Sequence, residues 1–339
     1  MDRVQNLAAS FFINNLKITH LHDLSHFFPP CFIAIFEVLK IKTIFHFNKI
    51  KIMKAIKRIL VPTDFSDNAR TAFDYALNLA EDMKASIKVV HIYTDFTPEM
   101  AIAEASYVAG GKSIAEVNEA LANFVDEEME TVGNIATARK VKVEAEVYYG
   151  SPVQDIVAMS KTGEYDLIIM GSMGEKNWGE LMFGSVSTHV SQKAYCPVLL
   201  VPNEIEYKKV KNIVYACDFD HKSFKHVGLV SDVAKTFAAN VHLLFVKTEE
   251  NERTNYEVDI EDMRIVFHTQ APKLTYTSKI ITEDDVVEGI NQYAQANNIE
   301  MVVAVTKHRR FWDRILHSSK TKEMAIYSEL PVLIIKAED

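Results

Sequence analysis

A cluster of glycines near the middle of this 339-residue chain has the spacing of a phosphate-binding loop. The cluster comprises Gly171, Gly174, Gly179 and Gly184. An apolar run, 167–170, precedes it, and Ser185 and Ser187 follow at the start of an expected helix. Because glycine has no Cβ atom, the backbone can approach a phosphate closely, and the free N–H groups of a helix N-terminus then bind the anion. The alternative is a simple turn between a strand and a helix.

An acidic residue stands at the end of the first expected strand. The apolar run 59–62 leads into Thr63 and Asp64, and Ser66 then suits the N-cap of a helix. In an open parallel sheet, ligands bind beyond the carboxyl ends of the strands, where the strand order reverses. Asp64 is therefore a candidate ligand contact. The alternative is a turn residue whose carboxylate accepts local hydrogen bonds.

The elements that must position these residues alternate between strands and helices. Apolar or alternating runs predict strands over 59–62, 87–92, 141–147, 167–170 and 197–201. Amphipathic or polar stretches predict helices over 69–83, 111–139 and 152–161, and from the glycine loop up to Tyr195. This order predicts an α/β fold with a doubly wound open parallel sheet of five strands and helices on both faces. The acidic stretch Asp126–Glu130 is expected on an exposed helix face, and His91 is expected to be a satisfied buried histidine.

The chain contains this unit twice. The segment Lys211–Asp220 aligns without a gap on Lys57–Ser66, and Met301–Lys336 aligns in the same way on Leu167–Pro202. Two periods of about 150 residues indicate a duplicated domain rather than a solenoid. We expect two such sheets in tandem, with a first copy over residues 53–203 and a second copy over 209–339.

Residues 1–52 differ in composition from both copies. They hold 8 of the 19 Phe, no Gly, and 6 Lys and Arg against 3 Asp and Glu. Neither of their apolar runs is long and uncharged enough to span a bilayer, and no signal-peptide cleavage site follows them. This composition is typical of translated non-coding DNA, so we expect a non-native or disordered leader and a native start at Met53. A membrane-surface anchor is the alternative.

The overall composition excludes several classes of protein. A net charge of −9 argues against a protein that binds nucleic acid. The three cysteines form no CxxC pair and no even framework, which favours a reducing cytoplasm. The histidines form no HExxH motif, so no metal site is predicted. No catalytic residue is identified.

The motifs together resemble those of the universal stress protein family, in its ATP-binding branch. The resemblance rests on the G-x2-G-x9-G-S pattern from Gly171 to Ser185 and on the first-strand segment Val61–Ser66. It extends over residues 53–202 by specific motifs and over 209–336 by the pattern of elements. It implies the adenine nucleotide alpha hydrolase-like fold, in a tandem form, and ATP as the ligand with Mg²⁺ or Mn²⁺.

The resemblance also assigns the contacts of the nucleotide. The adenosine end would lie against Pro62, Thr63 and Asp64, and the backbone of Ile92 would bond the adenine. The ribose and phosphates would lie in the loop formed by Gly171, Ser172, Met173, Gly174, Glu175, Lys176 and Asn177. The phosphate tail would be held by Gly184, Ser185, Val186 and Ser187.

The second copy departs from this pattern. Val305, His308 and Ser318 stand where the first copy has Gly171, Gly174 and Gly184. We therefore predict that it does not bind ATP in the family's manner. The resemblance implies that it pairs with the first copy through the last strands, 197–201 and 331–335. Whether whole chains pair further into a homodimer stays open.

These features predict an ATP-binding module that acts in the stress response through nucleotide-dependent signalling or protein interaction. Two alternatives remain. One is a weak ATPase or phosphotransferase, although no general base is identified. The other is an interaction scaffold that needs no nucleotide. Neither nucleic acid nor a membrane is an expected partner.

Overall fold

The computed structural model describes much of both copies. The described residues are 55–93, 107–108, 112–133, 141–172, 185–216, 226–247, 261, 264–265, 267–268, 271–272, 274–284, 286–306 and 330–336. The leader, 1–52, lies outside them. In the described part of the chain, no helix is both long and apolar enough to cross a membrane.

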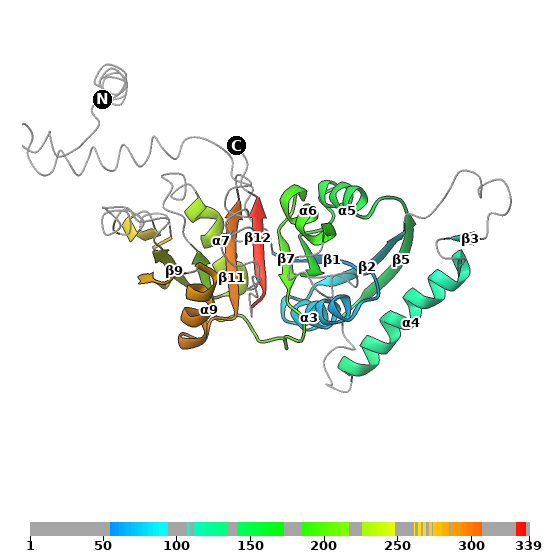
Figure 1. Cartoon of the computed structure of the whole chain (residues 1–339), viewed down its shortest axis with the longest axis horizontal. Coiled ribbons are helices and arrows are strands. Elements are labelled where there is room, and N and C mark those ends of the chain that lie inside the picture. The colour runs from blue at the N-terminus through cyan, green and yellow to red at the C-terminus, as the bar shows by residue number, and fades with distance from the viewer. Residues whose placement is uncertain are drawn as a thin grey trace, which may run out of the picture. The chain divides into compact units, whose positions relative to one another are not determined.

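The first copy has alternating strands and helices, as predicted (Figure 1). Its strands are β1 (Arg58–Pro62), β2 (Ser86–Tyr93), β5 (Val143–Tyr149), β6 (Leu167–Gly171) and β7 (Val198–Val201). Its helices are α3 (Asp67–Met83), α4 (Ile114–Gly133), α5 (Pro152–Lys161) and α6 (Ser185–Lys193). A short hairpin, β3 (Tyr107–Val108) and β4 (Lys112–Ser113), precedes α4.

The second copy repeats this order. It comprises β8 (Asn212–Ala216), α7 (Val227–Phe237), β9 (Asn240–Lys247), β10 (Tyr276–Thr282), α9 (Val286–Ala296), β11 (Met301–Thr306) and β12 (Val332–Lys336). The corresponding strands of the two copies pair in the same order and direction, which confirms the tandem α/β fold.

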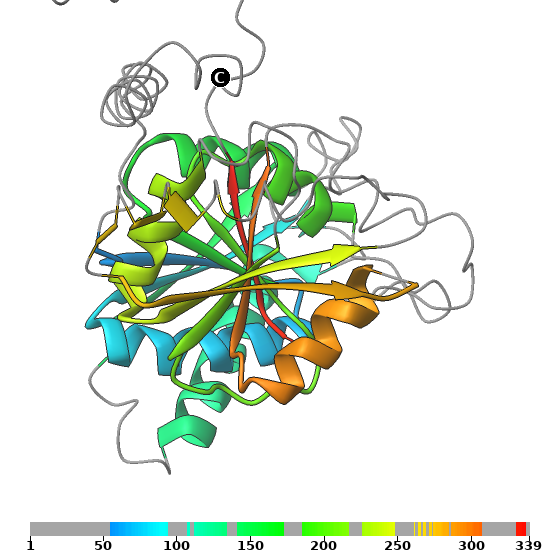
Figure 2. The ribbon, with the colours of Figure 1, turned by 90° about the vertical axis from the view of Figure 1, so that its left-hand side faces the viewer.

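The five strands within each copy are parallel. In the first copy they are ordered β5-β2-β1-β6-β7, and in the second β10-β9-β8-β11-β12. Strand β12 also runs antiparallel to β7, with Leu333 opposite Leu199. The strands show the usual twist of parallel sheets (Figure 2).

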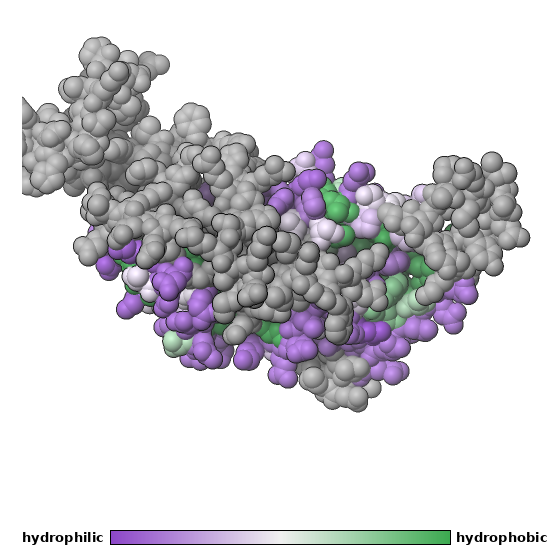
Figure 3. Space-filling model, viewed as in Figure 1, coloured by the Kyte–Doolittle hydropathy of each residue, from purple (hydrophilic) through white to green (hydrophobic). Residues whose placement is uncertain are grey.

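Helices cover both faces of the first copy's sheet. Figure 1 shows α3 and α4 on one face and α5 and α6 on the other. The central strands β1 and β6 are therefore buried on both sides and consist almost entirely of apolar residues. The described surface in Figure 3 is mainly hydrophilic, with a few apolar areas among the polar side chains.

Both copies begin with the same pair of hydrogen bonds, in which one carboxylate oxygen accepts from two adjacent backbone N–H groups. We call this arrangement the carboxylate clamp. In the first, Asp166 Oδ2 accepts hydrogen bonds from the backbone N–H groups of Lys57 (2.8 Å) and Arg58 (3.1 Å). In the second, Glu300 Oε2 accepts them from residues 211 (3.0 Å) and 212 (2.7 Å). Each carboxylate directly precedes the fourth strand of its copy and ties that strand to the first one. The duplication therefore extends to individual hydrogen bonds.

Candidate functional site

The candidate site lies where β1 and β6 end side by side. The two strands pair in parallel, with Ile59 opposite Leu167 and Leu60 opposite Ile168. From β1 the chain enters α3 on one face of the sheet, whereas α6, the helix after β6, lies on the other face (Figure 1). In open parallel sheets, ligands usually bind beyond the strand ends at the point where the connections diverge in this way.

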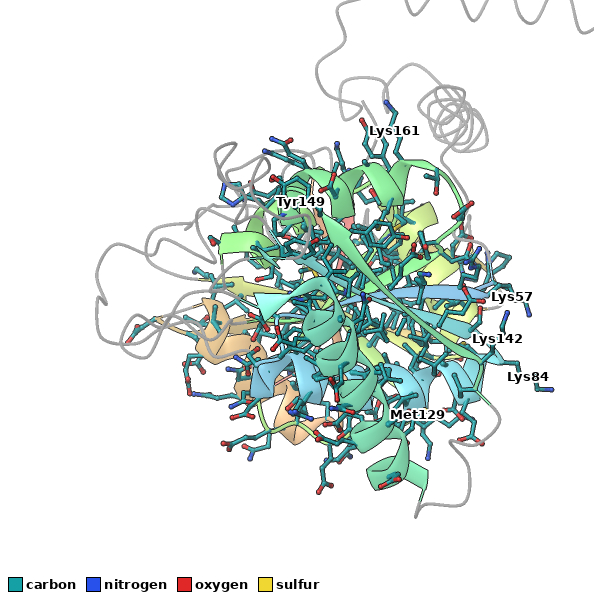
Figure 4. All side chains as sticks on the ribbon, turned by 90° about the vertical axis from the view of Figure 1, so that its right-hand side faces the viewer. Lys57, Lys84, Met129, Lys142, Tyr149 and Lys161 are labelled. Carbon is teal, nitrogen blue, oxygen red and sulfur yellow. The ribbon has the colours of Figure 1, made fainter. Side chains whose placement is uncertain are left out.

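Figure 4 shows which edge of the sheet this is. Tyr149 marks the carboxyl end of β5, whereas Lys57 and Lys142 lie at the opposite edge, where β1 and β5 begin. All strands of the copy run in the same direction. The predicted contacts after β1, β2 and β6 therefore share the edge marked by Tyr149.

The segment after β1 forms a tight, internally bonded turn. Thr63 N–H donates to the carbonyl oxygen of Val90 (2.9 Å), and Thr63 Oγ1 accepts from Phe65 N–H (3.0 Å). The carboxylate Oδ1 of Asp64 accepts from both the backbone N–H (3.1 Å) and the hydroxyl (2.6 Å) of Ser66. Asp64 thus acts as a turn residue whose carboxylate accepts local hydrogen bonds, which was the alternative to a ligand contact. Its side chain is nevertheless exposed, and none of these bonds involves Oδ2.

Ser66 connects this turn to α3. Its hydroxyl donates to Asp64 and accepts from the backbone N–H of Ala69 (3.3 Å), as expected of an N-cap. The predicted cap is confirmed. One hydroxyl group therefore both fixes the orientation of the Asp64 carboxylate and begins the helix.

An aromatic cluster supports the same turn, and the sequence analysis did not find it. The Phe65 ring lies 4.3 Å from the His91 ring and 5.7 Å from the Phe124 ring, between centroids. His91 Nδ1 donates to the carbonyl oxygen of Thr63 (2.9 Å). Phe65 has a positive φ of 66°, which is uncommon outside glycine. The one available signal was alternation along β2, which places His91 and the neighbouring Ile92 on opposite faces.

The backbone of Ile92 is directed toward the candidate site. The last β1–β2 pair is Pro62 with Val90, so β2 extends three residues past it, to Tyr93. Val90 offers its carbonyl to the β1 side, where Thr63 N–H binds it. Because backbone groups alternate sides along a strand, the N–H and C=O of Ile92 face the same side, beyond the end of β1. The Ile92 backbone groups therefore face the space beyond the end of β1.

Gly171 is needed for packing. A Cβ atom built on it would lie 2.8 Å from the carbonyl oxygen of Asn68, in the first turn of α3. The glycine therefore lets the end of β6 come against that turn. Gly171 does not have a positive φ, so the missing Cβ atom is the property that this position requires.

The N-terminus of α6 faces the same edge. Ser187 is buried, and its hydroxyl donates to the carbonyl oxygen of Ser172 (3.1 Å), while Ser172 N–H donates to Val201 (2.9 Å). These bonds fix the start of the helix against the end of β6. Ser185 is exposed and Val186 half-buried at the first turn, where the positive end of the helix dipole favours an anion.

The structure therefore brings part of the predicted site together. The described members are Pro62, Thr63, Asp64, Ile92, Gly171, Ser172, Ser185, Val186 and Ser187. The other predicted members lie outside the described residues: Met173, Gly174, Glu175, Lys176, Asn177 and Gly184. In the second copy, Val305 is described and buried, whereas His308 and Ser318 lie outside the described part. The described residues contain no group of three or more His, Cys, Asp or Glu side chains placed to hold a metal ion.

Comparison with known proteins agrees with this fold. The model of the universal stress protein family matches residues 55–202 and again 209–336. A universal stress protein of Methanocaldococcus jannaschii is 31% identical over 146 residues, which cover 43% of this chain and 81% of that protein. The stress response protein NhaX of Bacillus subtilis is 32% identical over 162 residues, covering 42% of this chain and 96% of that protein.

One solved structure is similar over both copies. It is a universal stress protein from Archaeoglobus fulgidus, with a TM-score of 0.57 and 18% identity. The match covers 85% of this chain and 98% of that one. At this level of identity the similarity shows the fold alone.

Proposed function

Because the chain belongs to the universal stress protein family, with two family domains in tandem, we propose that it is an ATP-binding module of the stress response. The nucleotide site would lie in the first copy, at the edge where β1, β2 and β6 end. The second copy would bind no ATP there, because its loop has Val305 in place of the first glycine. Binding would alter contacts with partner proteins in the cytoplasm.

The observation that carries this proposal is the convergence of three features, two of the backbone and one side-chain carboxylate, on the space beyond the end of β1. The N–H and C=O of Ile92 face the space beyond β1. The exposed Asp64 carboxylate borders that space, and the first turn of α6 points to it across Ser172. A base-binding strand edge, a carboxylate for sugar hydroxyls and an anion-binding helix end together suit an adenine nucleotide.

The residues present also indicate how a cation would be held. Mg²⁺ prefers oxygen ligands and is commonly bound through substrate phosphates with few protein carboxylates. Since the described residues provide no metal cluster, the phosphates of ATP would supply most of its ligands. The cation would neutralise phosphate charge beside the α6 N-terminus.

The role of the second copy would be structural. Strand β12 pairs with β7 through Val332, Leu333 and Ile334, all buried apolar residues. We infer that this pairing joins the copies in solution and leaves the nucleotide edge of the first copy accessible. A homodimer of whole chains would require a further surface.

A calorimetric titration with Mg·ATP tests the proposal. The wild-type chain should bind about one ATP per chain. Ser185→Glu should weaken binding by about tenfold or more, because it places a negative charge beside the phosphates while still suiting a helix N-terminus. Gln154→Glu is the matched control, since it adds the same charge to the exposed first turn of α5.

Each alternative predicts a different result. A scaffold would bind no ATP in the titration, and Ser185→Glu would behave as wild type in every assay. An ATPase would release phosphate above the background rate and lose that activity in Ser185→Glu. Nucleotide extracted from freshly purified protein provides an independent check.

A further inference from the structure

The interface between α3 and α4 contains more acidic groups than its one base can neutralise. Arg70 Nη1 donates to Glu127 (3.0 Å) and to Glu128 (2.9 Å) on α4. Asp74 lies one turn after Arg70 on α3 and is within hydrogen-bonding reach of Glu128. Glu128 is only 7% exposed, so the expected exposed face of Asp126–Glu130 is wrong at this residue.

Helices α3 and α4 provide no second cation. Arg70 is the sole basic residue within the bounds of both helices. The remaining charged side chains of the two helices are all acidic: Asp67, Glu81, Asp82, Glu116, Glu119, Asp126 and Glu130. On the covered face of the sheet, the strands contribute the titratable groups His91, Tyr93 and Tyr149, whereas Lys88 bonds Glu146 on the opposite face.

One carboxyl group in the cluster is therefore favoured to keep its proton. Burial, followed by the charge of Glu128 and a hydrogen bond to it, raises the pKa of Asp74 to about 7. Asp74 Oδ1 is buried without a hydrogen-bond partner, which also disfavours the charged form. In the protonated form, the Asp74 hydroxyl donates to Glu128, and Glu128 accepts from Arg70 as well.

The cluster is connected to the candidate site through aromatic rings. The Arg70 guanidinium lies 5.0 Å from the centroid of Phe124 on α4. Phe124 is buried and contacts Phe65 edge-on, and the Phe65 ring contacts the His91 ring at a tilt of 33°. Phe65 stands between Asp64 and Ser66 in the turn after β1. A change in the packing of α4, the long helix labelled at Met129 in Figure 4, therefore acts on that turn.

We propose that Asp74 and Glu128 form a proton-controlled joint between α3 and α4 that regulates nucleotide binding in the first copy. This inference rests on the proposed ATP site. With a proton shared between the two carboxyl groups, α4 packs on α3 and Phe124 supports Phe65. When both groups are ionised, their repulsion loosens α4, the turn after β1 loses its support, and the affinity for nucleotide falls.

ATP affinity measured between pH 5.5 and pH 8.5 tests the regulation. In the wild-type chain, Kd should rise about threefold to tenfold as pH passes through 7, after correction for the ionisation of ATP itself. Asp74→Asn should remove this rise, because the amide donates to Glu128 at every pH. Asp126→Asn makes the same change on the exposed face of α4 and should keep the wild-type profile. A rise in Kd that persists unchanged in Asp74→Asn would overturn the proposal.

Amide hydrogen exchange in α4 tests the joint without nucleotide. After correction for intrinsic rates, exchange over 114–133 should increase several-fold from pH 6 to pH 8 in the wild type and remain constant in Asp74→Asn. The proposed ATP site and the proposed joint can therefore be refuted independently of each other. Absence of ATP binding at every pH would overturn the proposed function, whereas equal exchange profiles of wild type and Asp74→Asn would overturn the joint.

Discussion

Gly171 at the end of β6 lies directly against the backbone of Asn68 in the first turn of α3. A Cβ atom at this position would be 2.8 Å from the Asn68 carbonyl oxygen and 2.9 Å from its carbonyl carbon. Backbone atoms cannot move aside as a flexible side chain can. The junction between the β6 end and α3, which forms one wall of the candidate site, therefore requires glycine.

Gly171→Ala should separate these two elements. We expect a loss of about 1–3 kcal/mol in the free energy of unfolding, the usual cost of overpacking, and a weaker affinity for ATP. Gly163→Ala is the control, because Gly163 has a φ of 77° but no atom within 4 Å of an added Cβ. It should cost about 1 kcal/mol through backbone strain and leave ATP affinity unchanged. Urea unfolding and calorimetry measure both effects; equal affinity loss in the two variants would contradict the local role of Gly171.

Removal of either carboxylate clamp should destabilise its own copy. Asp166→Ala would leave the N–H groups of Lys57 and Arg58 without their acceptor, and Glu300→Ala would do the same at residues 211 and 212. We expect each substitution to lower the free energy of unfolding by about 1–3 kcal/mol, measured by urea unfolding. Amide hydrogen exchange, followed separately in each copy, shows which copy is destabilised. Asp166→Asn keeps an acceptor oxygen and should retain most of the stability. An Asp166→Ala chain as stable as wild type would show that water replaces the clamp.

Gly150 and Asp155 should behave as a coupled pair. A Cβ atom on Gly150 would lie 1.9 Å from Asp155 Oδ2, so Gly150→Ala must displace the carboxylate at the start of α5. We expect a loss of about 1–2 kcal/mol in the single variant. The double variant Gly150→Ala/Asp155→Ala should recover part of it, which a double-mutant cycle in urea measures. Additive losses would mean that the two positions are independent.

The stability of the first copy should depend on pH through Asp74. Its pKa in the folded protein, about 7, exceeds the ordinary value near 4, so the folded state binds the proton more tightly. The stabilisation is therefore fully present below about pH 4 and is lost as pH rises through about 7. Because Asp74 is partly exposed and solvent screens its interactions, the expected loss in the free energy of unfolding is only about 1–2 kcal/mol. Asp74→Asn should be more stable than wild type at pH 8 and show no such loss in chemical denaturation; identical pH profiles would exclude a raised pKa.

Local patterns in the sequence predicted the elements well. The N-cap at Ser66 is confirmed, and helix α3 begins two residues before the predicted range. Strand β5 covers 143–149 instead of the predicted 141–147, because alternation alone does not show where pairing with β2 ends. Helix α4 begins at Ile114 rather than at the predicted 111, since a polar, alanine-rich segment gives a weak signal for its start; positions 134–139 of the predicted range lie outside the described residues.

Contacts between distant segments could not be predicted in this way. Phe65 and Phe124 are far apart in the chain, and nothing near either residue identifies the other as its neighbour. Glu128 was assigned to an exposed face because acidic runs are usually solvated, yet it follows Val117, Leu121 and Phe124 on the buried stripe of α4. Its burial depends on Arg70, which comes from another helix.

By itself, the sequence determined the duplicated α/β architecture, the strand ends that carry the predicted contacts and the family resemblance. These follow from periodicity, turn residues and motif spacing, which are local properties of the chain. The tertiary structure alone decided which groups face one another: Gly171 against Asn68, Ile92 beyond the end of β1, and Asp74 beside Glu128. Packing and burial set these relationships, and both depend on segments that meet only when the sheet and its helices assemble.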